Sequence, residues 1–314
     1  MKAVLDPAWR DQPTRRGLLA AGLAISTAPF VRTAQAQSPQ PTTRITRPIP
    51  HSGEPLPVVG LGTAQTFPSA GEAERPVLAK VIDALIAGGG KLIDTASTYG
   101  NAEAVIGEIL RAANARDKIF LATKIEVRSA KAGADEFAQS LQRLKTDKVE
   151  LLQLHNVSRA SQSLAQLRDW KAAGRCRYIG VTTTDDSDYG AMEAIIRREK
   201  PDFVQVDYSM DNRGAEKRVI PAAAEVGAAV LTALPLGRKS LFAAVRGKTL
   251  PDWAKDFDAA TWGQFFLKFL LGNPAVTAVI PGTGNPEHMT DNLGAASGRL
   301  PDAQTREKMA ALLG

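Results

Sequence analysis

The sequence predicts an α/β fold, a single-domain (β/α)8 TIM barrel, on three observations. Eight short apolar runs alternate with eight helix-like segments over about 240 residues. Several runs are apolar throughout, which is typical of parallel strands that are covered on both faces. The first run, in the segment GLGTAQTF, lacks the third glycine that a dinucleotide-binding open sheet would carry, so a doubly wound sheet is the less favoured alternative.

The apolar runs give the strands in chain order, and glycines follow several of the helix-like segments, where C-caps are expected. We expect strands at 57–64, 91–97, 118–125, 149–156, 176–183, 202–209, 228–236 and 275–282. We expect helices at 72–88, 101–115, 133–145, 160–173, 186–199, 213–226, 260–271 and 286–297. A longer loop is expected at 237–260 and a short extra helix at 301–313. With no further segment to cover the barrel mouth, the sequence favours an open site.

The first segment, residues 1–36, is typical of an export signal. Paired arginines, Arg15 and Arg16, precede a mainly apolar run to Phe30, and the small-residue motif AQA ends at Ala36. The apolar run is shorter than the roughly 20 residues that a bilayer span needs. The segment resembles a twin-arginine (Tat) signal, which implies the Tat export machinery as a partner, cleavage after Ala36 and a periplasmic location.

Composition divides the rest of the chain into a linker and a barrel, and it limits the kinds of partner that the protein can have. Residues 37–53 are proline-rich and are expected to be a linker, and residues 54–314 form the barrel. The net charge is +6, but no run of Lys and Arg follows the signal, so nucleic acid is not expected. No later segment is predicted to span a membrane. One cysteine excludes an intrachain disulfide, and one cysteine with three histidines gives no plausible metal site.

Titratable residues end three successive predicted strands. Asp94, Lys124 and His155 close strands two, three and four, and Tyr99 lies in the loop after strand two. Barrel active sites form at the carboxyl ends of strands, and neighbouring strands lie about 4.8 Å apart, so these side chains should converge. A phenol is a general acid near neutral pH when an ammonium lies beside it, and a carboxylate can hold that ammonium. Each residue alone has an ordinary structural explanation, but their coincidence predicts an active site.

The segments LIDTASTYG, ATK, LQLHN and GRCRYIGVT resemble the aldo/keto reductase superfamily, over about residues 56–297. The resemblance implies an NAD(P)-dependent oxidoreductase that reduces aldehydes or ketones to alcohols, or runs the reverse reaction. It makes Tyr99 the general acid, Lys124 and Asp94 its supporting pair, and His155 the residue that orients the carbonyl. The physical reason is that hydride addition builds negative charge on the carbonyl oxygen, which a proton donor relieves.

The resemblance also implies cofactor contacts, position by position. The segment after strand five has two threonines in place of the family's Ser-Asn pair, and Ala233 or Leu234 stands where a tyrosine usually stacks on the nicotinamide. The glycine-containing segment IPGTGNPEHMTDN should hold a phosphate at a helix start. The expected contacts are Gly62, Thr63, Thr182, Thr183, Gln205, Leu236, Arg238, Gly282, Thr283, Gly284, His288, Asp291 and Asn292.

The sequence leaves three points open. NADP(H) is favoured over NAD(H), although Gly282 and His288 replace the lysine and arginine common in the family. The alternative function is a cofactor-binding redox sensor or partner subunit with little turnover, and a Schiff-base reaction at Lys124 is a more remote one. Free NADPH is not expected outside the cytosol, so a redox partner, unknown from the sequence, would have to recycle the cofactor there.

Overall fold

The computed structural model describes residues 44–127, 129–159 and 162–313. The predicted signal, residues 1–36, lies outside the described residues. Within these ranges, no helix has the length and apolar character needed to cross a membrane.

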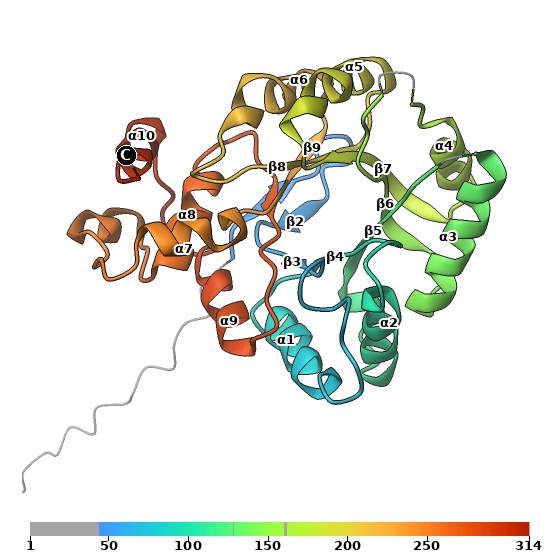
Figure 1. The fold of residues 1–314 in the computed structure, drawn as a ribbon, viewed down its shortest axis with the longest axis horizontal. Helices are drawn as coiled ribbons and strands as arrows, with labels where there is room; N and C mark the ends of the chain where they lie inside the picture. The colour runs from blue at the N-terminus through green and yellow to red at the C-terminus, as the bar shows by residue number, and fades with distance from the viewer. Residues whose placement is uncertain (1–43, 128, 160–161, 314) are drawn as a thin grey trace, which may run out of the picture. The chain divides into compact units, whose positions relative to one another are not determined.

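Eight parallel strands form the wall of a barrel, and they follow one another in chain order (Figure 1). Short bridges close the sheet between its first and last strands, since Val59 pairs with Val279 and Gly62 pairs with Gly282. The predicted (β/α)8 barrel is therefore confirmed. The strands are β3 (Leu61–Gly62), β4 (Leu92–Asp94), β5 (Phe120–Ile125), β6 (Val149–Leu154), β7 (Cys176–Thr183), β8 (Phe203–Asp207), β9 (Ala229–Ala233) and β10 (Ala278–Val279).

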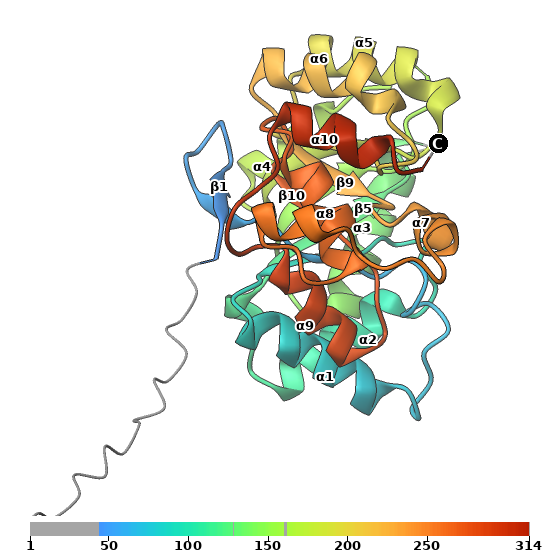
Figure 2. The same ribbon diagram turned by 90° about the vertical axis from the view of Figure 1, so that its left-hand side faces the viewer.

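Helices surround the strands, and Figures 1 and 2 show them as an outer layer. Gly227 ends one of them, α6, in the left-handed conformation that glycine favours, with a φ of 72°. The helices that alternate with the strands are α1 (Arg75–Ala87), α2 (Ala102–Ala112), α3 (Ala130–Leu144), α4 (Ala165–Ala172), α5 (Tyr189–Glu199), α6 (Val219–Val226), α8 (Trp262–Leu271) and α9 (Pro286–Gly294). The predicted extra helix is α10 (Ala303–Ala310).

The stretch predicted as a loop, 237–260, is partly helical. It contains α7 (Ser240–Ala244) and two 3-10 helices, Gly237–Lys239 and Asp252–Phe257. Buried apolar side chains of these turns, Leu241 and Phe257, belong to the hydrophobic core. The longest of these helical pieces has six residues, which is too short to give a helical period in the sequence, and this is why the sequence favoured a loop.

A hairpin that the sequence did not predict lies within the described part of the presumed linker. Strands β1 (Thr46–Pro48) and β2 (Pro55–Pro57) pair in antiparallel fashion, so residues 46–48 are strand and the linker prediction is wrong for them. Ile49 and Leu56 of this hairpin join the apolar cluster inside the barrel. Prolines in both strands masked the hairpin in the sequence, because proline is typical of linkers as well as of edge strands.

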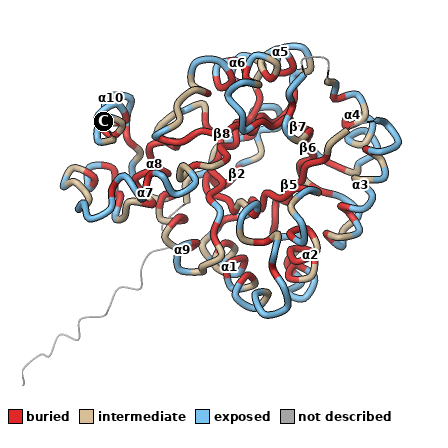
Figure 3. Tube along the Cα trace, in the orientation of Figure 1, coloured by how far each residue is buried: buried red, intermediate tan, exposed pale blue. Residues whose placement is uncertain are grey.

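The barrel interior follows the two-residue period of the strands. An apolar cluster fills the inside, and Figure 3 shows the strands as a largely buried wall. Its strand members are Leu92, Phe120, Ala122, Leu151, Tyr178, Phe203, Ala229, Leu231 and Ala278. Two residues further along the same strand faces, the side chains change from apolar to polar, at Asp94, Lys124, Gln153 and Gln205. The alternation therefore directs these polar groups inward, toward the carboxyl ends of the strands.

Candidate active site

The turn after β4 places Tyr99 beside the barrel mouth. The backbone N–H of Tyr99 donates to the carbonyl of Ala96 at 3.1 Å, and the next residue, Gly100, has a φ of 46°. A Cβ atom on Gly100 would lie 2.7 Å from the carbonyl oxygen of Pro68. The turn therefore requires glycine, and it fixes the direction in which the half-buried tyrosine leaves the backbone.

Asp94 and Lys124 form a buried ion pair at the ends of β4 and β5. The Nζ atom of Lys124 lies 2.6 Å from Oδ2 of Asp94 and donates to the carbonyl of Thr95 at 2.8 Å. The side chains are only 2% and 4% exposed. Burial lowers the pKa of the Lys124 ammonium, but the charge of Asp94 and the nearby Tyr99 hydroxyl outweigh it, so this pKa lies above its ordinary value. The lysine is therefore held as a cation.

Tyr99 lies between this cation and His155. The Nζ atom of Lys124 is 5.0 Å from the centroid of the Tyr99 ring, so the ammonium lies against the face of the phenol. The rings of Tyr99 and His155 meet edge to face, with centroids 5.6 Å apart and an interplanar angle of 74°. The four residues that the sequence singled out are thus brought together at one end of the barrel.

His155 is held as a neutral imidazole. Burial lowers its pKa to about 4, with a further contribution from the Lys124 charge. Its Nδ1 atom lies 3.2 Å from the hydroxyl of Thr98. A neutral imidazole carries one N–H donor and one acceptor, so it can donate a hydrogen bond to a carbonyl oxygen without bringing a second positive charge.

Two glutamines bind the Asp94 carboxylate from beneath. Gln205 on β8 donates from Nε2 to Oδ2 of Asp94 at 3.2 Å, and Gln153 on β6 donates from Nε2 to Oδ1 at 3.4 Å. From the sequence, Gln205 is expected to contact the cofactor, and no role is predicted for Gln153. The available signal was the strand period, because Gln153 lies two residues before His155 on the same face.

Gly62 and Thr63 support the same region of the barrel. The Thr63 hydroxyl donates to the carbonyl of Asp94 at 2.9 Å, and its backbone N–H donates to the same oxygen at 3.1 Å. A Cβ atom on Gly62 would lie 2.7 Å from the carbonyl of Ile280, so glycine is needed where β3 meets the last strand. Both residues thus lie against the catalytic strand ends, and their contact with a cofactor stays a prediction.

The two threonines at the end of β7 are buried and form hydrogen bonds within the chain. The Thr182 hydroxyl accepts from the backbone N–H of Asn156 at 3.0 Å, and the Thr183 hydroxyl accepts from that of Asp185 at 3.2 Å. Ala233, where the family usually has a tyrosine, is 8% exposed at the end of β9. The structure therefore supplies no aromatic ring at that position.

The segments after β9 and β10 carry the remaining predicted contacts. Leu236 is half-buried and Arg238 is exposed in the first of them. Gly282 is exposed, and Gly284 directly precedes Asn285. The Asn285 side chain caps α9, because its oxygen accepts from the backbone N–H of Glu287 at 2.8 Å. A Cβ atom on Gly284 would meet nothing closer than the Thr66 side chain, at 3.6 Å.

This glycine segment fits a phosphate. A helix start presents N–H groups and a positive dipole end, and two glycines leave the backbone open to an anion. Thr283 between them is largely buried, and its hydroxyl accepts from the Asn285 N–H at 3.0 Å. The residues that would hold a dinucleotide phosphate are therefore Gly282, Thr283 and Gly284.

The three predicted contacts on α9 lie in different surroundings. His288 is exposed, and Asn292 is 5% exposed. The Asp291 carboxylate accepts from the Thr261 hydroxyl at 2.9 Å and from Nε2 of Gln264 at 2.8 Å, which joins α9 to α8. Asp291 thus has a structural role in addition to the predicted contact with adenosine.

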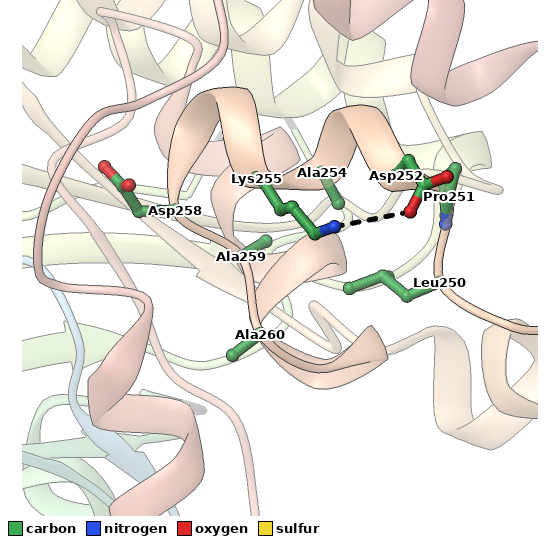
Figure 4. A pocket seen from close by; sticks show the side chains of 8 residues that line it. All are labelled: Leu250, Pro251, Asp252, Ala254, Lys255, Asp258, Ala259 and Ala260. Atoms are coloured by element: carbon green, nitrogen blue, oxygen red, sulfur yellow. Dashed lines mark hydrogen bonds and ion pairs between the residues drawn. The ribbon is translucent and has the colours of Figure 1, made fainter.

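A separate hollow of about 460 Å³ lies in the segment before α8 (Figure 4). Its lining includes Asp252 and Lys255, whose Nζ and carboxylate oxygen are 3.4 Å apart, together with Leu250, Pro251, Ala254, Asp258, Ala259 and Ala260. None of these residues belongs to the catalytic group or to the predicted cofactor contacts. The hollow is therefore not the active site.

A buried lysine–carboxylate pair lies beside a tyrosine and a neutral histidine at the strand ends of a (β/α)8 barrel, and this arrangement is chemically able to donate a proton. Comparison with known proteins gives the family. The family model "Aldo/keto reductase family" matches residues 58–311. The chain is 30% identical over 273 residues to an "Aldo-keto reductase" of Mycobacterium sp. (strain MCS), covering 84% of this chain and 88% of the relative. The chain belongs to the aldo/keto reductase family, as the resemblance implied, and is an oxidoreductase.

Two further similarities extend this finding. The "Methylglyoxal reductase YeaE" of Escherichia coli (strain K12) is 31% identical over 189 residues, which are 58% of this chain and 65% of that protein. A solved aldo-keto reductase of Klebsiella pneumoniae, described as a complex with NADPH, has a TM-score of 0.70 at 24% identity. It covers 86% of this chain and 95% of its own, and it supports the fold.

Proposed function

We propose that this chain reduces aldehydes or ketones to alcohols with NADPH, or catalyses the reverse reaction, with Tyr99 as the general acid. The observation that carries the proposal is the buried pair of Lys124 and Asp94, 2.6 Å apart, whose ammonium lies 5.0 Å from the Tyr99 ring. A cation fixed at this place favours release of the phenol proton, because it stabilises the phenolate that remains.

The proton moves from the Tyr99 hydroxyl to the carbonyl oxygen of the substrate. When bound, a reduced nicotinamide supplies the hydride that the carbonyl carbon accepts. The C=O π bond breaks, the oxygen takes the phenol proton, and the product is an alcohol. Lys124 then faces the phenolate, and Asp94 keeps the ammonium in position through the reaction.

His155 orients the substrate in this proposal. Its pKa of about 4 keeps the ring neutral at physiological pH. A ring N–H can therefore donate to the same carbonyl oxygen that receives the proton from Tyr99, and the two donors together select one orientation of the substrate. The edge-to-face contact of the two rings keeps them at one side of the mouth.

The cofactor preference for NADP(H) rests on two lines of support. The Klebsiella pneumoniae structure of the same fold is described as a complex with NADPH. In this chain, the glycine segment before α9 and the cap of that helix fit a phosphate. Arg238 and His288 are exposed cationic or titratable groups on the neighbouring segments and would contribute to phosphate binding.

We also propose that the chain is exported by the Tat route, which carries folded proteins. The support is the sequence of residues 1–36, with its paired arginines and the AQA motif. A variant with both Arg15→Lys and Arg16→Lys should stay in the cytoplasmic fraction, whereas the native chain should appear in the periplasm without its first 36 residues. Equal distribution of the two chains would refute this proposal.

The test of the catalytic proposal uses the chain from residue 37 onward, with NADPH and methylglyoxal as the first substrate, because a relative is a methylglyoxal reductase. Tyr99→Phe should lower kcat by about 100-fold or more, since general acids contribute about 10²–10⁴. NADPH binding, measured by fluorescence, should change less than about twofold. Wild-type turnover that survives Tyr99→Phe undiminished would remove Tyr99 as the acid.

A further inference from the structure

The inside of the barrel contains a buried amide to which the family resemblance assigns no role and which the proposed mechanism does not use. Gln153 is fully buried on β6. Its Nε2 atom donates to Oδ1 of Asp94 at 3.4 Å and to Oε1 of Gln205 at 3.0 Å. Gln205 in turn donates to Oδ2 of Asp94 at 3.2 Å, so the three side chains form a closed ring of hydrogen bonds.

This ring spans strands that are not neighbours. Gln153 on β6 and Gln205 on β8 are separated by β7, whose inward position between them is Gly180. A Cβ atom on Gly180 would lie 3.0 Å from Cγ of Gln153 and 2.9 Å from the carbonyl of Phe203. Glycine at this position leaves the room in which the two amides meet, so the sequence of β7 is adapted to the ring.

The ring also fixes how each amide is oriented. If the Gln153 amide were rotated by 180°, its oxygen would face both the Asp94 carboxylate and the Gln205 oxygen, and acceptors would oppose acceptors. In the observed orientation, Oε1 of Gln153 has no hydrogen-bond partner among the described residues. Leaving a buried acceptor unpaired costs free energy. The two hydrogen bonds that Nε2 donates offset this cost and keep the amide in the observed orientation.

We propose that Gln153 is a positioning residue for proton transfer, which holds the Asp94 carboxylate against Lys124 and so keeps the ammonium beside Tyr99. The inference rests on the proposed function of that site. Asp94 has one oxygen facing Lys124 and Gln205, and only Gln153 among the described side chains donates to the other oxygen. Without that donor only the bonds at Oδ2 hold the carboxylate, and Oδ1 is a buried acceptor without a partner, which favours a rotation of the carboxylate relative to the lysine.

The first test replaces the amide by a side chain of similar length without a donor, Gln153→Met. The expected result is a kcat lowered by about tenfold to a hundredfold, because a displacement of about 1 Å in a catalytic group can cost about a hundredfold. The KM for methylglyoxal and the Kd for NADPH should change less than about twofold, since Gln153 lies below the site that both occupy.

The chain offers a matched control. Gln166 on α4 also has a buried Oε1 atom without a partner among the described residues, and its Nε2 atom donates to the carbonyl of Ala130 at 2.6 Å. Gln166→Met therefore removes an exposed side-chain hydrogen bond that involves none of the four proposed catalytic residues. It should lower the thermal midpoint without changing kcat.

A second variant tests the positioning role through its pH profile. Gln153→Glu puts a second carboxyl group against Asp94, and like charges in contact favour the protonated form of one of them. A protonated carboxyl group donates a hydrogen bond as the amide did. The ratio of the variant's kcat to the wild-type kcat should therefore rise as the pH falls from about 8 to about 6. A residue with only a structural role would give a constant ratio.

The outcomes separate this inference from the proposed function. Wild-type chain that turns over no aldehyde or ketone contradicts the proposed function. Gln153 can then still be judged from the crystal structure of Gln153→Met, in which the Asp94 carboxylate should rotate away from Lys124. An unchanged carboxylate in that structure, or an active wild type with a Gln153→Met kcat within about twofold of it, overturns the inference.

Discussion

Replacing Asp94 by Asn tests the central ion pair directly. Asp94→Asn keeps the shape of the side chain but removes the negative charge that lies 2.6 Å from the Lys124 ammonium. The lysine side chain is 2% exposed, so it cannot reach water without a change in the backbone. It would keep its bond to the carbonyl of Thr95 at 2.8 Å and its place 5.0 Å from the centroid of the Tyr99 ring.

The expected loss follows from this burial. Removing one partner of a buried ion pair costs about 3–5 kcal/mol, because the other charge is left uncompensated. That is a large share of a total stability of about 5–15 kcal/mol. At about 2–4 °C for each kcal/mol in a domain of this size class, the thermal midpoint should fall by roughly 6–20 °C.

The pH dependence has opposite signs in the two chains. In the native chain the pKa of Lys124 is raised, so its stabilising contribution is complete below about pH 10.5 and is lost as the pH rises through the folded-state value. In Asp94→Asn, burial is the dominant effect and lowers the pKa of Lys124. The unfolded chain then binds more protons than the folded one, so stability rises with pH up to about 10.5.

The assay is thermal unfolding of both chains at pH 7 and pH 9.5, with the double variant Asp94→Asn, Lys124→Met as the control. The double variant removes the unpaired charge, so it should recover much of the lost stability at both pH values. A single variant that loses less than about 1 kcal/mol, or that becomes less stable between pH 7 and pH 9.5, would refute the reasoning.

Three other expectations depend on different parts of the site. By NMR, the His155 ring should titrate near pH 4. The free energy of unfolding should fall as the pH drops from about 6.5 toward 4, because the unfolded chain takes up the proton first. Titration near about pH 6.5 would contradict a buried neutral ring. Gly62→Ala should destabilise the chain by about 1–3 kcal/mol, since its Cβ would lie 2.7 Å from the Ile280 carbonyl. Gly284→Ala, with Thr66 no closer than 3.6 Å, should leave the thermal midpoint unchanged and weaken NADPH binding. Equal thermal midpoints for the two alanine variants would contradict the close contact between Gly62 and Ile280 that closes the barrel.

Much of the barrel could be predicted because parallel strands covered on both faces are apolar along their length. The runs that end at Asp94, Lys124 and His155 each gave a strand within a few residues of its observed bounds. The hairpin was missed for a physical reason. Its strands have three residues each and contain proline, and it is stabilised mainly by distant contacts, such as Ile49 and Leu56 inside the barrel.

The catalytic residues were predictable individually, but the contacts that hold them were not. Counting two residues back from His155 puts Gln153 on the inner face of β6, yet that does not say which side chain it meets. The register sets Gln153 opposite Lys124 and Gly180, whereas Gln205 is opposite Thr182, two residues further along β7. The amides still meet, because the strands of a barrel are tilted and are staggered relative to one another. The sequence of one chain does not reveal the size of that stagger. The support of Asp94 is therefore a property of the closed barrel rather than of any one segment.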